Sequence, residues 1–204
     1  GGVAKGVTRE MQNRLIEIGQ HMVEFAQFSL QLWQDAILSN EMYREMLWSG
    51  AFLHRTHNIG LVDEHKQLNF YDGKVRIVDV EGREIALYPP SDYAQHIAER
   101  VEPWTYVKFP YLKHIGWKGL TDGMDSGIYR STPLARLNVS EGLATPRAQE
   151  AYEALYAYMG GKPVHATLAT HWARLVEMLY ASERMLELAA DERILDPDIR
   201  TIPT

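Results

Sequence analysis

His54, His57, Asp63 and His65 are residue types that bind transition metals, and they lie close together in the chain. On a helix His54 and His57 would share one face, because residues three apart are neighbours there. With His65 they would offer imidazole ligands to zinc or iron, and Asp63 would add an oxygen. Imidazoles of this kind also occur as ordinary capping or surface groups, and the spacing across Gly60 is not that of a recognised motif. A histidine-ligated metal protein is therefore the weaker alternative.

A second polar group recurs every three residues near the end of the chain, at His171, Arg174 and Glu177. This spacing places the three side chains on one side of a helix. Arg174 can pair with Glu177 or with another helix, and His171 falls among apolar residues, where a hydrogen-bonded core histidine is expected. The functional alternative is that this helix orients groups around a metal centre held by other segments.

Arg136 follows Pro133-Leu134-Ala135 and is a candidate for a buried ion pair. A guanidinium group suits this role because its planar fork can donate two hydrogen bonds to one carboxylate. We expect an architectural rather than a catalytic function for this residue.

The decapeptide that contains Arg136, residues 129–138, reads Tyr-Arg-Ser-Thr-Pro-Leu-Ala-Arg-Leu-Asn. It resembles a signature of the nickel-iron hydrogenase large subunit, Tyr-Arg-Val-Gly-Pro-Leu-Ala-Arg-Leu-Asn, and differs only at Ser131 and Thr132. The local backbone can differ from the family there, because threonine cannot copy a positive φ that glycine adopts.

Further segments resemble the same family in the expected order along the chain, and their character is that of the cytosolic multimeric class, the methyl-viologen-reducing or NAD-reducing hydrogenases. These segments are Gly1-Gly2-Val3, residues 68–73, residues 101–108, residues 116–119 and residues 171–177. The matches cover nearly the whole chain. They indicate the central region of a large (alpha) subunit.

The resemblance implies that the parent enzyme reversibly oxidises dihydrogen to protons and electrons at a nickel-iron centre, which two Cys-x-x-Cys pairs hold. The present chain has no cysteine. We therefore expect no catalytic, cofactor-binding or metal-binding residue here, no cofactor bound by this chain, and no activity in the chain alone. The implied partners, in the cytoplasm, are the remainder of the large subunit, the electron-transfer subunits and the iron-sulfur small subunit.

The first residue is Gly1 rather than methionine, and the chain ends at Thr201-Ile202-Pro203-Thr204 without a charged or capping finish. We interpret the chain as the middle of a longer protein. The main alternative is a complete, non-catalytic helical module that serves in interaction or assembly.

The composition is that of a globular protein, with 46% hydrophobic and 24% charged residues in 204. The net charge of -6 and the lack of a basic run argue against nucleic acid as a partner. No apolar stretch is long enough to span a bilayer, which argues against a membrane protein. We expect a single domain over residues 1–204.

A long helix is predicted over residues 8–38. Its expected buried stripe consists of Leu15, Ile18, Met22, Phe25, Phe28, Leu32 and Ala36. Asn40 is the expected N-cap of a second helix over residues 41–53.

Alternating apolar and polar residues over 74–80 and 83–88 predict a small β-hairpin within about 68–88. A helix is expected from Ser91 to Val101, before Pro103. Residues 104–143 are predicted to be rich in loops, with glycines spaced among aromatic residues.

Thr145-Pro146 predicts a helix start with a capping hydroxyl, and Gly160-Gly161 predicts its end. A last long helix is expected after Pro163, to about Ala190. The predicted fold class is mainly α, a long-helix bundle with a small β-hairpin insertion. Apolar faces shaped for absent neighbours would encourage homo-oligomers of this chain.

Overall fold

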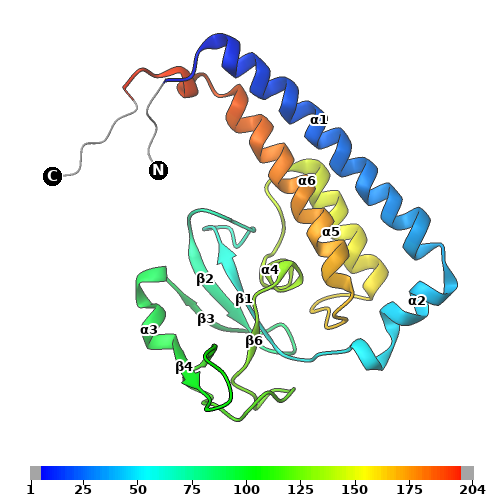
Figure 1. Ribbon diagram of the computed structural model, residues 1–204, viewed down its shortest axis with the longest axis vertical. Coiled ribbons are helices and arrows are strands. Elements are labelled where there is room, and N and C mark those ends of the chain that lie inside the picture. Colours follow the sequence, from blue (N-terminus) through cyan, green and yellow to red (C-terminus); the bar gives the residue numbers. More distant parts are fainter. Residues whose placement is uncertain (1–5, 199–204) are drawn as a thin grey trace.

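A computed structural model of the protein describes residues 6–198 (Figure 1). Gly1-Gly2-Val3 and the last four residues, which entered the sequence argument, lie outside this range. The α-helices are α1 (Arg9–Trp33), α2 (Glu41–Trp48), α3 (Tyr93–His96), α4 (Pro133–Val139), α5 (Pro146–Met159) and α6 (Ala169–Ala190). The strands are β1 (His57–Val62), β2 (Lys74–Val78), β3 (Glu84–Tyr88), β4 (Ile97–Val101), β5 (Lys108–Leu112) and β6 (Tyr129–Arg130). A π-helix, η1 (Gln34–Leu38), and the 3-10 helices η2 (Gly50–Phe52), η3 (Pro90–Asp92) and η4 (Glu192–Leu195) complete the order.

Helix α1 starts at the N-cap Thr8, whose hydroxyl accepts from the N–H of Met11. It packs lengthwise on α6 through a stripe of Gln12, Gly19, Val23 and Ala26 (Figure 1). A Cβ at Gly19 would lie only 3.2 Å from the Cα of Leu186, so the two backbones approach closely here. Small residues permit this approach.

The stripe that the sequence predicted to be buried is therefore not the one that contacts α6. Ile18, Met22, Phe25, Phe28 and Leu32 are all exposed. The prediction was wrong because the buried face of a helix is usually inferred from the spacing of its large apolar residues. Where two helices approach closely, the contact face instead consists of small residues.

Two of the shorter helices, α2 and α5, start at the predicted residues. Asn40 caps α2 by accepting from the N–H of Tyr43, although α2 ends at Trp48 and not at Leu53. Helix α5 ends at Gly160, which adopts a left-handed φ of 79°. The hydroxyl of Thr145 makes no cap bond to α5, so the predicted capping hydroxyl is wrong although the helix does start at Pro146.

Strands β1, β2, β3 and β6 form one sheet in the order β3-β2-β1-β6. Strands β2 and β3 are antiparallel, and β1 pairs antiparallel with β2 and parallel with β6. The strands expected within 68–88 are thus half of a larger sheet and not an isolated hairpin.

Strands β4 and β5 form a second, two-stranded antiparallel sheet. The predicted helix from Ser91 to Val101 is wrong beyond His96, because Ile97–Val101 pairs with Lys108–Leu112. Ile97 and Leu112 are buried there with Ile77 and Tyr88 of the first sheet. These contacts join residues that are far apart in the sequence, so the local pattern over 91–101 could not predict them. They favour a strand over a helix at Ile97–Val101.

The fold class is therefore α/β rather than the predicted mainly α bundle. About half of the chain is helical, and the two sheets have four and two strands. The larger core lies among α1, α4, α5 and α6, and the smaller one lies on the far side of the four-stranded sheet. Figure 1 shows α4 between the sheet and the long helices.

None of the helices within residues 6–198 combines the length and the apolar character that crossing a bilayer requires.

Candidate functional site

The decapeptide at 129–138 forms β6 and α4, where the four-stranded sheet meets the long helices. Thr132 precedes α4 with an extended backbone, φ -76° and ψ 172°, and Pro133 occupies the first helical turn. Six of the seven residues of α4 are buried. The segment predicted to be loop-rich, 104–143, thus contains β5, β6 and this central helix.

Arg136 joins α4 to α6. Its Nε and Nη2 atoms donate to the two carboxylate oxygens of Glu177, at 2.6 Å each. Nη1 donates to the carbonyl of Ser131 at 3.1 Å, and the guanidinium lies 5.8 Å from the ring centre of Phe70. Glu177 is buried, and its partner is Arg136, whereas the sequence left open a pair with Arg174.

Arg130 ties β6 to two other segments. Its Nη2 donates to the carbonyl of His54 at 3.0 Å, and the carbonyl of His165 and the hydroxyl of Thr167 lie 3.5 Å away. Nη1 has no hydrogen-bond partner among the described residues. Burial lowers the pKa of this guanidinium.

The side-chain amide of Asn138 takes part in four hydrogen bonds inside the core. Nδ2 donates to Asn58 Oδ1 at 3.2 Å and to the carbonyl of Val164 at 2.9 Å. Oδ1 accepts from the Tyr156 hydroxyl at 2.9 Å and from the N–H of Val164 at 3.0 Å. One side chain therefore connects the sheet, α5 and the segment before α6.

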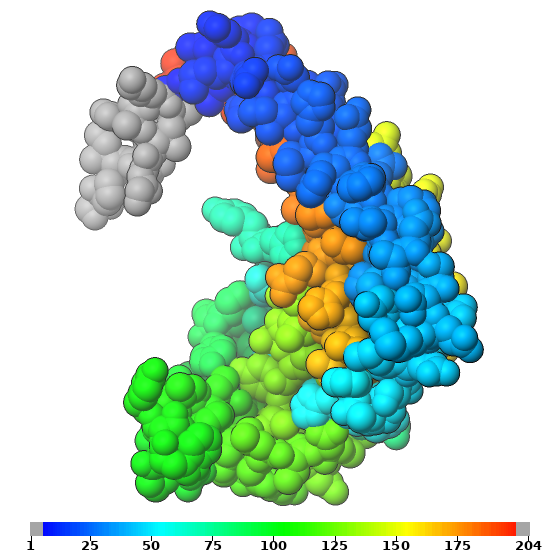
Figure 2. All heavy atoms as spheres, turned by 45° about the vertical axis from the view of Figure 1, so that its right-hand side comes forward, coloured from blue at the N-terminus to red at the C-terminus, as the bar shows by residue number. Residues whose placement is uncertain are grey.

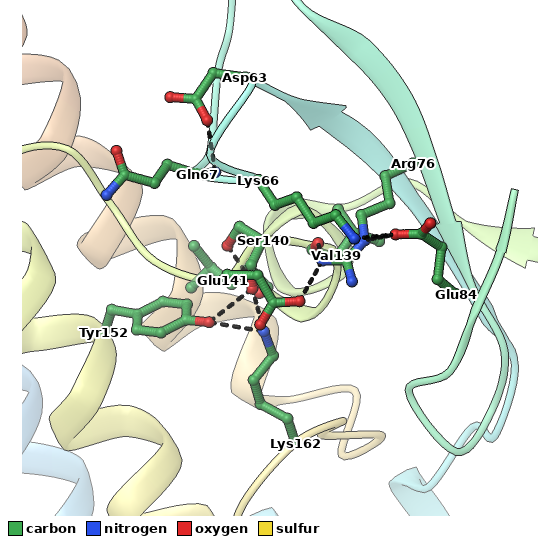
Figure 3. A network of polar contacts seen from close by, with 11 residues as sticks. Asp63, Lys66, Gln67, Arg76, Glu84, Val139, Ser140, Glu141, Tyr152 and Lys162 are labelled. Atoms are coloured by element: carbon green, nitrogen blue, oxygen red, sulfur yellow. Dashed lines mark hydrogen bonds and ion pairs between the residues drawn. The ribbon is translucent and has the colours of Figure 1, made fainter. Parts of the chain in front are cut away.

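The polar network continues past the end of α4 (Figure 3). Arg76 of β2 donates to the carbonyl of Val139 and forms ion pairs with Glu84, at 2.8 Å, and Glu141, at 2.7 Å. Lys66 also reaches Glu84, at 2.8 Å.

Lys162 meets the same helix end from the other side. Its ammonium donates to the carbonyl of Ser140 and, at 2.7 Å, to the Tyr152 hydroxyl. It lies 5.3 Å from the ring centres of both Tyr152 and Tyr156. The residue as a whole is exposed, but the ammonium group is enclosed, and this burial lowers the pKa of Lys162 to about 8.

The histidines of the proposed metal site lie apart. His57 is buried in β1, and its Nε2 contacts the carbonyl of Met124 at 3.1 Å. Burial lowers its pKa. His54 pairs with Asp122, whereas His65 lies in an exposed turn that Asp63 closes by accepting from backbone N–H groups.

Within residues 6–198, no three His, Cys, Asp or Glu side chains are grouped so that they could hold a metal ion. Nickel-iron and iron-sulfur centres prefer soft thiolate ligands, and the sequence has no cysteine. The residues present therefore do not fit such a centre.

His171 and Arg174 are both exposed on α6, so the expected core position of His171 is wrong. Among the predicted residues, Arg136 and Glu177 are the two that the structure brings together. Arg130 and Asn138, which the sequence argument passed over, lie in the same decapeptide, so the motif itself was their signal. Arg76 and Lys162 had no such signal, because their partners are remote in sequence.

The arrangement as a whole fixes α4 against the sheet, against α5 and α6, and against the segment between these two helices.

No protein-family model matches the chain. A curated relative from Archaeoglobus profundus, the iron-sulfur subunit of an F420-non-reducing hydrogenase, is 40% identical over 200 residues, which is 98% of this chain and 41% of the relative. The NAD-reducing hydrogenase HoxS subunit beta of Cupriavidus necator is 35% identical over 186 residues, which is 91% of this chain and 35% of the relative. Among solved structures, an NAD+-reducing NiFe-hydrogenase in the H2-reduced state matches with a TM-score of 0.85 and 29% identity, over all of this chain and 43% of that one.

The chain is similar to hydrogenase subunits along almost its whole length. It spans about two fifths of the length of these relatives. One relative is named an iron-sulfur subunit, the other a subunit beta, and these names contradict the predicted large (alpha) subunit. The prediction of a large (alpha) subunit is therefore wrong, and the relatives that the chain resembles are hydrogenase subunits of the kinds named here.

Proposed function

We propose that the chain is a structural segment of one subunit of a multisubunit nickel-iron hydrogenase, an oxidoreductase that reversibly oxidises dihydrogen to protons and electrons. The observation that carries the proposal is the match in fold to a solved hydrogenase chain over the full length of this one. The identity of 40% over 200 residues to an F420-non-reducing hydrogenase subunit supports it.

In this proposal the chain supplies the frame and not the metal ligands. Parts of the protein outside these residues would hold the metals, because this chain offers no thiolate. The proposed partners, in the cytoplasm, are the electron-transfer subunits of the complex and the remainder of the same polypeptide.

The first and last helical elements of the described residues contact each other, which supports a role as a frame. Arg9, at the start of α1, makes two hydrogen bonds of 2.6 Å to the carboxylate of Glu192 in η4. The side chain of Gln12 reaches the carbonyl of Asp191, at 3.4 Å. Segments that precede α1 and follow η4 would therefore start from neighbouring points, as a frame that holds two flanking parts together requires.

The test is to produce the longer polypeptide together with its neighbouring subunits and to measure nickel, iron and dihydrogen-dependent reduction of a viologen dye. We expect bound metal and activity in this complex, and neither in the 204-residue chain alone. Stoichiometric nickel in the isolated chain, or a metal-loaded complex without activity towards dihydrogen, would contradict the proposal.

The same samples decide between the alternatives. An assembly module without chemistry would bind the neighbouring subunits as the 204-residue chain alone, and a complex formed in this way would not need the longer polypeptide. A histidine-ligated metal protein would retain zinc or iron in the isolated chain, and that metal would be lost on substitution of His57.

A further inference from the structure

Helix α1 exposes a stripe of large apolar side chains that α6 does not cover. Phe25 and Phe28 are 54% and 61% exposed, and Leu32 is 51% exposed. Met11, Ile18 and Met22 extend this stripe towards the start of the helix. We call these six residues the apolar stripe. A stripe of this length on one helix is unusual for a surface that faces water.

A groove lies beside the stripe, between α1 and α6. It encloses about 380 Å³, and its lining includes Leu15 of α1, Ala181, Met185 and Leu188 of α6, Phe70 and Ile194. Nearly all of the lining is apolar. Figure 2 shows an open hollow between the long helices and the sheet region.

The segment that follows α6 runs along this groove and contacts the start of α1. After α6 the chain turns at Asp191, and η4 places Ile194 in the groove lining. The bonds from Arg9 to Glu192 hold η4 against the start of α1. The start of α1 and η4, the first and last helical elements of the described residues, therefore both lie beside the groove.

We propose that the apolar stripe and the groove are the docking surface for a helical segment of the same polypeptide, from outside these 204 residues. This inference rests on the proposed function, in which the chain is part of a longer subunit. The matched relatives have more than half of their length outside the matched region. A covalently linked segment is always present, which suits an apolar face, whereas transient partners meet more polar faces.

The experiment uses the full-length subunit in its complex, with Phe25 replaced by the photoreactive residue benzoylphenylalanine. After illumination, the cross-linked peptides are identified by mass spectrometry. We expect a cross-link within the same polypeptide, to a peptide outside residues 1–204. The same replacement at Phe28 covers the case in which the first variant does not assemble.

The matched control places the same photoreactive residue at Gln20, which is exposed on the opposite side of α1. No cross-link to that peptide is expected from Gln20. A cross-link from Phe25 to a second copy of the chain or to another subunit would overturn the proposal, as would the absence of any cross-link from both Phe25 and Phe28. This readout does not depend on metal or activity, so its failure is distinct from failure of the proposed function.

Discussion

Arg136 of α4 and Glu177 of α6 are joined by two parallel N–H···O bonds of 2.6 Å, and the carboxylate is buried. This bidentate pair fastens the helix of the signature decapeptide to the long helix that runs through the larger core. The pair therefore holds α4 against α6.

The first prediction concerns this pair. Glu177→Gln should lower the free energy of unfolding by about 2 to 4 kcal/mol, because it leaves a partly buried guanidinium without its charged partner. Chemical denaturation measures the change. Glu187→Gln is the matched control, since it removes an exposed pair with Arg184 on the same helix and should cost at most about 0.5 kcal/mol. If the two substitutions lowered the free energy of unfolding equally, the buried pair would stabilise the protein no more than the exposed pair does.

The second prediction concerns the amide of Asn138. Asn138→Ala should destabilise the protein by at least about 3 kcal/mol, because it leaves buried groups of Val164 and Asn58 without partners. Tyr156→Phe removes only one of the four bonds and should cost about 1 kcal/mol. If the alanine variant proved as stable as the phenylalanine variant in thermal and chemical unfolding, the network would not be the anchor described here.

The third prediction tests the close contact of β1 with α4. A Cβ at Gly60 would lie 2.7 Å from Cγ2 of Val139 and 3.2 Å from the Cα of Arg136. Gly60→Ala should therefore destabilise the protein by about 1 to 3 kcal/mol through overpacking. Gly50→Ala meets no atom within 4 Å and should change stability by less than about 0.5 kcal/mol. Unchanged stability of the Gly60 variant would mean that the strand and the helix separate easily.

The fourth prediction concerns Lys162 and pH. Its folded-state pKa, about 8, lies below its ordinary value of 10.5 because the ammonium is buried. From pH 8 to pH 10 the unfolded chain keeps this proton while the folded protein releases it, so stability should rise with pH over this window. Below about pH 8 both states are protonated, and the contribution of Lys162 no longer changes with pH.

The measurement for this prediction is the pH dependence of the unfolding free energy in the original protein and in Lys162→Met. The difference between the two should favour the original protein increasingly from pH 8 to pH 10. The window ends there because Tyr152 and Tyr156, whose pKa values burial raises, begin to ionise in the unfolded chain near pH 10 and act in the opposite direction. If the unfolding free energies of the two proteins changed with pH in the same way, Lys162 would not be the source of the rise in stability.

Local signals in the sequence determined several parts of the fold. Asn40 marks the start of α2, Gly160 marks the end of α5 with its positive φ, and the alternation over 74–88 marks β2 and β3. The lack of cysteine determined that no thiolate-bound metal centre can lie within these residues. Each of these conclusions depends only on residue types or on contacts within one turn or one strand, which composition and periodicity can show.

The tertiary structure decided the rest, because the deciding contacts join residues far apart in the chain. Pairing of His57 and Asn58 with Tyr129 and Arg130 creates the β1–β6 edge of the sheet, and no periodicity within either segment predicts it. The close approach at Gly19 decided which side of α1 is buried, so Phe25 and Phe28 remain exposed. A periodic pattern shows that a helix has apolar residues, but the packing surface depends on the shape of the partner, and that shape exists only in the folded chain.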